Sequence, residues 1–428
     1  MDLNIERNGK KRVVIVGGGF GGLELAQQLR YSGLQVVLID RHNYHQFQPL
    51  IYQVASAGME PSSISFPFRK IFQHYHDFYF RMAEVTDVLP ERHIVQTTAG
   101  EIEYDYLVLA AGATTNFFGN KHIEAVAMPM KSMSEATAVR NLILGNIERA
   151  VTCTDKVEQQ ELLNVVIVGG GATGVELAGV IAEMKKTILP YDYPDLDSSL
   201  MNIYLIQGAN RLLPNLSIES SRAAEQFLRS MGVNVILSKL VTDFEHHRAI
   251  MGDGSTIATQ NFIWVSGIMG VKFDHLSGDV IGRGGRLKVD EFNKVEGLEH
   301  VFAIGDIAIM KDDNKYPDGH PQVAQVAIQQ GKLLAKNIRR IAMNTPQKPF
   351  RYKDLGSMAT VGRNKAVAEL SMGNTQGFIA WILWLLVHLR SILGIRNKLV
   401  VLLNWMWNYV NYKQSLRMIF TTGKGKQM

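Results

Sequence analysis

Two glycine clusters with identical spacing are the residues in this chain most clearly suited to chemistry. The first is Gly17, Gly19 and Gly22, and the second is Gly169, Gly171 and Gly174. In a G-x-G-x-x-G loop the first glycine permits a tight turn, the second lets a pyrophosphate approach, and the third allows close helix–strand packing. The free N–H groups of the following helix favour a phosphate. The sequence therefore predicts two dinucleotide sites.

The residue that ends the next strand differs between the two copies. After the first loop the strand VVLID ends in Asp40, a carboxylate that can accept hydrogen bonds from ribose hydroxyls. After the second loop the strand NIYLIQG carries Gln207 in that place. An amide can still bind a ribose but does not repel a 2′-phosphate. The second site is predicted to bind NADH, with NADPH left open because Arg211 lies nearby; another acid could also serve in place of Gln207.

A third strand-like segment, Val301 to Asp306 (VFAIGD), places a carboxylate after a glycine. Asp306 is expected to bind a ribityl or ribose hydroxyl in the first domain. Two dinucleotide sites in one chain suit hydride transfer from an exchanging nicotinamide to a resident flavin. We therefore expect FAD at the first loop and NADH at the second.

The elements around the loops predict an α/β fold with two Rossmann-like domains, the second inserted in the first. Each loop lies between a run of β-branched residues and a helical pattern. Two further strand-like segments follow later in the chain, one from Tyr106 to Ala111, which stops at Gly112, and one from Phe262 to Gly267. The predicted FAD domain comprises residues 1–115 and 290–345, and the NAD(P)H domain comprises 116–289. Residues 346–428 form a C-terminal region with an amphipathic membrane-anchoring helical segment.

The C-terminal region is basic and apolar. No Asp or Glu follows Glu369, whereas seven Lys and Arg do, in a chain of net charge +5. Two apolar runs, 378–389 and 399–410, are each about 18 Å long as helices, too short for a hydrocarbon core of about 30 Å. Four of the five tryptophans lie here: Trp381, Trp384, Trp405 and Trp407. We expect helices lying in the headgroup layer, with a buried homodimer hairpin as the alternative.

Further residues resemble one known family. The loops, FAIGD at Phe302 to Asp306, AQVAIQQG at Ala324 to Gly331, and the basic tail resemble type II NADH:quinone oxidoreductases. So do DRHNYHQFQPLIYQVASAG at Asp40 to Gly58 and AAGATTNFFG at Ala110 to Gly119. The resemblance covers nearly the whole chain. Gln207 is the departure, because many members carry a carboxylate there.

The resemblance implies specific site residues. FAD would be bound by Gly17, Gly19, Phe20, Gly22, Asp40, Arg41, Gln48, Val85, Gly112, Asp306 and Ala324. The nicotinamide dinucleotide would be bound by Gly169, Gly171, Gly174, Gln207 and Gly267, with Glu176 near the nicotinamide. Ala324 and Gln325 would line the flavin edge, and Gln325 and Gln329 would face the quinone. No metal site is expected.

Elementary chemistry is compatible with these roles. Gln325 and Gln329 lie on one helix face, and an amide can donate to a quinone carbonyl; a solvated helix face is the alternative. Glu176 lies early in a helix, where a carboxylate also interacts well with the helix dipole. The single Cys153 excludes a redox cysteine pair, and with it flavin disulfide reductases and sulfide:quinone reductases.

The sequence therefore predicts a respiratory enzyme that passes two electrons from NADH through FAD to a membrane quinone without pumping protons. No signal or transit peptide is evident, and the expected location is the cytoplasmic face of the inner membrane, bound through residues 378–428. A nucleic-acid partner is not expected. The alternatives are a soluble NAD(P)H-dependent reductase of a ferredoxin-like protein and a flavin-containing redox sensor.

Overall fold

The computed structural model describes residues 3–276, 278–371, 373–411 and 416–419. The chain forms two compact units. The first unit takes residues 1–46, 66–114 and 268–354, and the second takes 47–65, 115–267 and 355–428. Apart from residue 115, the units differ from the predicted domains in four segments: 47–65 and 355–428 lie in the second unit, and 268–289 and 346–354 lie in the first.

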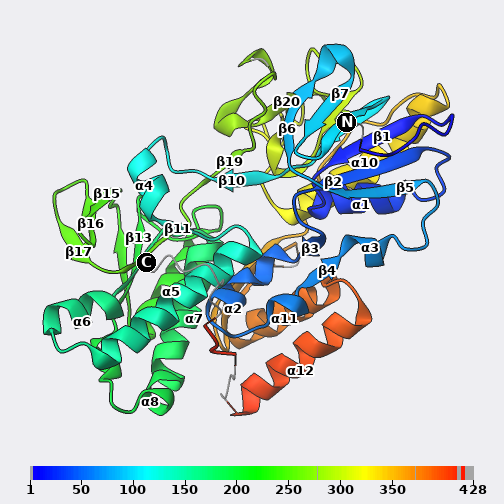
Figure 1. Cartoon of the computed structure of the whole chain (residues 1–428). Coiled ribbons are helices and arrows are strands. Elements are labelled where there is room, and N and C mark those ends of the chain that lie inside the picture. Colours follow the sequence, from blue (N-terminus) through cyan, green and yellow to red (C-terminus); the bar gives the residue numbers. More distant parts are fainter. Residues whose placement is uncertain (1–2, 277, 372, 412–415, 420–428) are drawn as a thin grey trace. The chain divides into compact units, whose positions relative to one another are not determined.

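The first unit contains a five-stranded parallel sheet in the order β21-β9-β1-β2-β5 (Figure 1). Its strands are β1 (Arg12–Val16), β2 (Gln35–Asp40), β5 (Phe78–Met82), β9 (Tyr106–Leu109) and β21 (Val301–Ala303). Strands β1, β9 and β21 are buried throughout, as their continuous apolar sequences require in a parallel sheet. Helix α1 (Phe20–Gln28) packs on α10 (Ala324–Ala342).

Smaller elements complete the first unit. They are α3 (Phe68–Ile71), the antiparallel strands β6 (Val85–Leu89), β7 (Ile94–Thr97) and β8 (Gly100–Glu103), and the strands β3 (Tyr44–Gln46), β19 (Ile268–Gly270), β20 (Leu287–Val289) and β22 (Ala308–Met310). Strands β4 (Ser65–Pro67) and β10 (Ala113–Thr115) lie where the chain passes from one unit to the other.

The second unit repeats the parallel sheet in the order β11-β18-β12-β13-β14. Its strands are β11 (Met128–Pro129), β12 (Val165–Val168), β13 (Ile203–Gln207), β14 (Val233–Leu237) and β18 (Asn261–Trp264). Its helices are α2 (Ile51–Ala55), α4 (Lys121–Val126), α5 (Met133–Thr152), α6 (Lys156–Leu163), α7 (Ala172–Thr187), α8 (Leu189–Asp192) and α9 (Ile218–Ser230). A capping box formed by Ser132 and Glu135 starts α5. A three-stranded sheet joins β15 (Val241–Glu245), β16 (Arg248–Met251) and β17 (Thr256–Ala258).

The C-terminal part of the second unit is a small sheet with two helices. The antiparallel strands are β23 (Ser357–Gly362), β24 (Lys365–Leu370) and β25 (Gly373–Gln376), and the helices are α11 (Phe378–Ser391) and α12 (Ile395–Asn411) (Figure 1). Helix α11 packs on β24 and α7 on β23. Within the described ranges, no helix has both the length and the apolar content needed to cross a bilayer.

The predicted α/β class with two parallel Rossmann-like sheets is confirmed. The segments expected to be strands at Tyr106, Phe262 and Val301 are β9, β18 and β21. Both apolar runs of the tail form helices, whereas residues 412–415 and 420–428 of the predicted anchor lie outside the described residues.

Candidate active site

The two glycine loops share one geometry. A Cβ atom at Gly22 would lie 1.9 Å from the carbonyl oxygen of Gly17, and one at Gly174 would lie 1.9 Å from that of Gly169. Real Cβ contacts essentially never fall below 3.0 Å, so neither position tolerates a side chain. In both copies the third glycine therefore lets the helix begin directly against the strand that precedes it.

The helix starts of both loops are suited to phosphate. Gly19 caps α1 and Gly171 caps α7, in neither case with a side-chain hydrogen bond. A Cβ atom added at either glycine would meet nothing within 4 Å. Free N–H groups and the positive end of the helix dipole favour an anion there. Both loops therefore fit the pyrophosphate of a dinucleotide such as FAD or NADH.

Asp40 and Gln207, which were predicted to bind ribose hydroxyls, also accept hydrogen bonds from backbone N–H groups of the neighbouring glycine loops. The Gly18 N–H donates to Asp40 Oδ2 at 2.6 Å, and the His42 N–H donates to Asp40 Oδ1 at 2.7 Å. In the second copy, the Gly170 N–H donates to Gln207 Oε1 at 2.8 Å. A carboxylate has about four lone-pair sites, so Asp40 keeps acceptors for a ribose, and Gln207 keeps its NH₂ donors.

Arg211, considered as a partner for a 2′-phosphate, is held by its own loop. Its guanidinium donates to the carbonyl oxygens of Pro214 at 2.6 Å and Leu216 at 2.9 Å. It also donates to Ser221 Oγ at 3.4 Å. These hydrogen bonds direct the guanidinium group towards the segment that leads into α9. A 2′-phosphate would therefore have to compete with these acceptors for the guanidinium N–H groups.

His45, which was not among the predicted site residues, supports the first loop. The side chain is buried, and its Nδ1 lies 3.0 Å from the Gly18 carbonyl oxygen. Its ring meets Phe20 edge-on at 5.2 Å. Burial lowers the pKa of His45, so the ring is neutral and Nδ1–H donates to that carbonyl. The only signal in the sequence is its place shortly after Asp40.

Helix α10 holds the Gly-Asp turn, η7 (Gly305–Ile307), that was predicted to bind flavin. The Gly305 N–H donates to Oε1 of buried Gln330 at 2.7 Å, and Gln322 Nε2 donates to the Asp306 carbonyl at 2.9 Å. Gln330 was not predicted as a site residue. Ala324 is the first residue of α10 and precedes Gln330 by six residues, nearly two turns of the helix.

The two predicted quinone residues on α10 have different surroundings. Gln329 Nε2 donates to the Lys353 carbonyl at 2.8 Å, and its Oε1 accepts the Lys353 N–H at 3.0 Å. Gln329 is thus fixed to the main chain and retains one N–H for another acceptor. Gln325 is half-buried, one turn earlier on the same helix.

The remaining predicted residues lie at element ends. Gln48 Nε2 donates to the Lys131 carbonyl at 2.9 Å, within the second unit. Gly112 lies three residues after β9 with φ +73°, and Gly267 lies three residues after β18 with φ +79°. The chain after each strand therefore takes a left-handed backbone conformation, which favours glycine. Val85 begins β6, and Arg41 is exposed.

A cavity of about 400 Å³ lies within the second unit. It is bounded by α2, α7, the β23–β24 turn, α11 and α12, and both aromatic and acidic residues line it. The aromatic lining residues are Tyr52, Trp381, Trp384, Trp405 and Tyr409. The acidic ones, Glu176 and Glu183, both come from α7. An apolar, aromatic cavity with a few polar groups is typical of a site for a small organic ligand.

Glu176 enters this cavity as a neutral acid. It is 9% exposed, and the Thr360 N–H at 3.4 Å from Oε1 is a weak partner. Burial raises the pKa of Glu176 to about 8, so the carboxyl is protonated at neutral pH. Helix α7 can lie close to β23 because Gly179 has no side chain. A Cβ atom at this position would fall 1.6 Å from the Val361 carbonyl oxygen.

Gln53 of α2 joins this helix to the tail helix α12. Gln53 Nε2 donates to the Tyr52 hydroxyl at 2.9 Å, and Trp405 Nε1 donates to Gln53 Oε1 at 3.0 Å. The Trp384 ring lies 6.4 Å from Tyr52 and 5.9 Å from Trp405. The tail helices are therefore part of the cavity wall.

The outer faces of α11 and α12 are apolar. The exposed residues are Phe378, Ile379, Leu386, Val387, Ile395, Leu399, Leu402, Leu403, Met406, Trp407 and Val410. Arg390 and Arg396 are exposed beside them, whereas Lys413, Lys424 and Lys426 lie outside the described residues. The expectation that the tail tryptophans face lipid headgroups is wrong for Trp384, which is 1% exposed, because it packs into the cavity wall.

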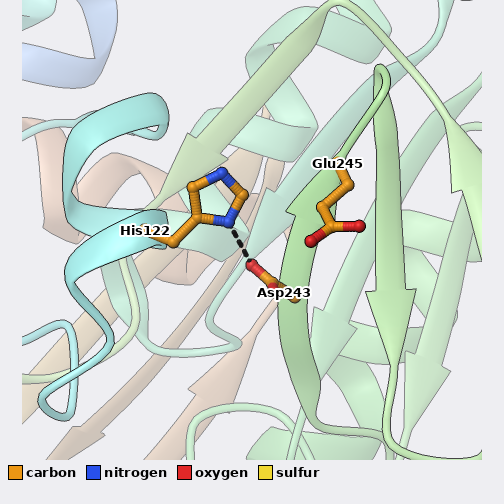
Figure 2. Close-up of side chains that lie close together, drawn as sticks. All are labelled: His122, Asp243 and Glu245. Carbon is orange, nitrogen blue, oxygen red and sulfur yellow. Dashed lines mark hydrogen bonds and ion pairs between the residues drawn. The ribbon is translucent and has the colours of Figure 1, made fainter.

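Figure 2 shows a separate polar cluster, His122 facing Asp243 with Glu245 beside them. His122 Nδ1 lies 2.7 Å from Asp243 Oδ1, and Asp243 also accepts the Phe244 N–H at 2.8 Å. His122 and Glu245 are exposed. The histidine and the aspartate hydrogen-bond to each other at the surface, where such a pair contributes little free energy.

Known proteins share both parts of this architecture. Residues 11–331 match the pyridine nucleotide-disulphide oxidoreductase family, and residues 355–413 match the NDH2 C-terminal domain. The type II NADH:quinone oxidoreductase Ndh of Mycobacterium tuberculosis is 33% identical over 420 residues, which is 95% of this chain and 89% of the relative. The corresponding Haemophilus influenzae enzyme is 30% identical over 393 residues, 84% of this chain and 87% of the relative.

Solved structures agree on the fold. NDH2 from Plasmodium falciparum in complex with NADH has a TM-score of 0.87 at 21% identity and covers 96% of this chain and 100% of that one. The sulfide:quinone oxidoreductase of Aquifex aeolicus has a TM-score of 0.72 at 20% identity, covering 91% of this chain and 92% of that one. With the sequence relatives, the paired loops and the C-terminal domain, this chain belongs to the FAD-dependent type II NADH:quinone oxidoreductases.

Proposed function

We propose that this chain oxidises NADH at the loop before α7 and reduces a quinone whose headgroup enters the cavity of the second unit. One observation carries the proposal. Helix α7 begins at the second glycine loop and, five residues after its Gly171 cap, places the buried acid Glu176 in the cavity. A single rigid element thus connects the expected nucleotide site with a proton donor.

FAD is assigned to the first loop. The residues that would hold it are Gly17, Gly19, Phe20, Gly22, Asp40, Arg41, Gln48, Val85, Gly112, Asp306 and Ala324. When bound, FAD would accept a hydride and pass on two electrons. His45, Gln330 and Gln322 support this assignment indirectly, because they fix the loop and the Gly-Asp turn.

NADH is assigned to Gly169, Gly171, Gly174, Gln207 and Gly267, with Glu176 on the nicotinamide side. Gln207 repels a 2′-phosphate less than a carboxylate would, so we expect weak discrimination against NADPH. Arg211 is occupied by loop carbonyls, which favours NADH.

The quinone oxygens need hydrogen-bond donors as they gain charge. The protonated Glu176 is one such donor in the cavity, whereas Gln325 and Gln329 on α10, also predicted as quinone residues, are not among the residues that line it. Stacking against the tryptophans of the cavity suits a planar headgroup.

A peripheral position on the cytoplasmic face of the inner membrane is part of the proposal. The exposed apolar faces of α11 and α12, with Arg390 and Arg396 beside them, suit insertion into anionic headgroups. A homodimer through the same faces is the competing interpretation.

Anaerobic stopped-flow absorbance of the purified holoenzyme tests the proposal. NADH should bleach the flavin band and a short-chain quinone should restore it. Glu176→Gln should slow the restoring phase by about a hundred-fold, as loss of a general acid does. Glu225→Gln, at a half-buried residue of α9 paired with Arg229 and outside the cavity lining, is the control. A flavin that NADH bleaches but quinone never restores would rule out this function.

A further inference from the structure

We infer that Glu183 carries protons from solvent to Glu176, an inference that rests on the proposed function. The reaction NADH + quinone + H⁺ → NAD⁺ + quinol consumes one solvent proton in each turnover. When Glu176 gives its carboxyl proton to a quinone oxygen, a buried carboxylate remains. Since an unpaired buried charge is costly, this carboxylate must be protonated again before the next cycle.

The geometry of α7 places the two acids in series. Glu176 and Glu183 are seven residues apart, which is two turns and about 10 Å along one side of the helix. Between them Gly179 closes the contact with Val361 of β23. The shared cavity is therefore the connection, and its volume of about 400 Å³ has room for water, at about 30 Å³ per molecule, beside a headgroup.

Exposure gives the direction of the path. Glu176 is buried, whereas Glu183 is half-buried. Two exposed residues line the same cavity at the Glu183 end: Lys186, which follows Glu183 by three residues, and Ser230, whose Oγ accepts from Lys365 Nζ at 3.3 Å. The sequence from solvent to quinone is thus Glu183 first and Glu176 second.

The groups around Glu183 allow it to take up and release a proton. Burial raises its pKa, while the Arg363 N–H and the charges of Arg363 and Lys365 lower it. The other titratable groups lining the cavity are Tyr52 on α2, Lys186 on α7 and Tyr409 on α12. Burial is the largest of these influences, so the pKa of Glu183 lies above its ordinary value.

Flavin reoxidation by a short-chain quinone, measured from pH 6 to pH 8.5, tests the inference on the full-length holoenzyme. Glu183→Gln keeps an acceptor for the Arg363 N–H but cannot carry a proton. It should slow reoxidation about ten-fold, more strongly as pH rises, and leave reduction by NADH unchanged. Formate, a small weak acid, should restore the rate of this variant without accelerating the wild type.

Glu183→Asp separates proton transfer from a structural role, because it keeps an ionisable carboxyl on α7. It should retain most of the rate and the wild-type pH profile, and Glu225→Gln should match the wild type. Wild-type rates and pH profile in Glu183→Gln would overturn the inference. So would equal slowing in Gln and Asp variants without formate rescue. A wild-type flavin that quinone does not reoxidise would instead refute the proposed function itself.

Discussion

Glu176 is a residue whose chemistry is set by its burial. Burial raises its pKa to about 8 from an ordinary 4.5, so the folded protein holds a proton that the unfolded chain releases. Between these two values the folded state binds more protons than the unfolded state. The contribution of this carboxyl group to the free energy of unfolding is therefore fully present below pH 4.5, and it is lost as the pH rises towards 8.

The corresponding prediction concerns Glu176→Gln. The free energy of unfolding of the wild type should fall by about 1.4 kcal/mol for each pH unit through this window, relative to the glutamine variant. Urea denaturation of both proteins at pH 5, 6, 7 and 8 measures the difference. A constant gap between the two proteins would show that Glu176 ionises normally.

Gln207 is the residue that we expect to influence the choice between NADH and NADPH. Gln207→Glu would place a negative charge beside the ribose, while its oxygen still accepts the Gly170 N–H. Discrimination against NADPH should sharpen by about ten-fold, equivalent to about 1.4 kcal/mol. The ratio of kcat/KM for NADH and NADPH in both proteins gives the answer. An unchanged ratio would mean that the side chain does not face the ribose.

At the scale of elements, α7 combines three tasks. Its start follows the second glycine loop, its first turns carry Glu176, and Gly179 allows it to lie against β23. The Thr360 and Arg363 N–H groups of the β23–β24 region then meet the two acids of the helix. The C-terminal sheet therefore positions a helix that belongs to the nucleotide-binding fold.

Gly179→Ala tests this packing. The added Cβ would overlap the Val361 carbonyl oxygen, so α7 and β23 must separate, at a cost of about 1–3 kcal/mol or more. Gly145→Ala on α5 is the matched control, because nothing lies within 4 Å of its Cβ position. It should be neutral or stabilise by up to about 1 kcal/mol. Thermal denaturation of both variants provides the comparison; equal effects would contradict the close α7–β23 contact.

At the scale of the whole molecule, the tail has two faces with different tasks. Its inner face supplies Trp384 and Trp405 to the cavity wall, and its outer face is exposed and apolar. Removal of residues 378–428 would therefore damage the cavity as well as the expected membrane anchor. Point substitutions on the outer face distinguish the two tasks.

Leu403→Glu and Val410→Glu, at positions 61% and 73% exposed, should abolish flotation with anionic liposomes and leave reduction of a water-soluble quinone intact. Val157→Glu on α6, 67% exposed and outside the tail, should float like the wild type. If the protein that carries both Leu403→Glu and Val410→Glu still floats with liposomes but becomes monomeric, the outer face serves dimerisation. Analytical ultracentrifugation in parallel reports that outcome.

Much of the architecture follows from local sequence. A glycine loop between a β-branched run and a helical pattern specifies strand, turn and helix, because only glycine permits the close approaches at Gly22 and Gly174. The strands β9, β18 and β21 and the two tail helices are likewise readable from continuous apolar runs. These features depend on residues near one another in the chain.

The sequence alone thus determined the family, the paired nucleotide loops and the candidate residues within them. The tertiary structure decided what distant residues do together. Only folding brings the β23–β24 turn and the tail tryptophans to α7, which forms the cavity and buries Glu176 and much of Glu183. Local spacing had suggested a helix-dipole role for Glu176, but its proton affinity depends on desolvation by residues far along the chain, and no local pattern encodes that.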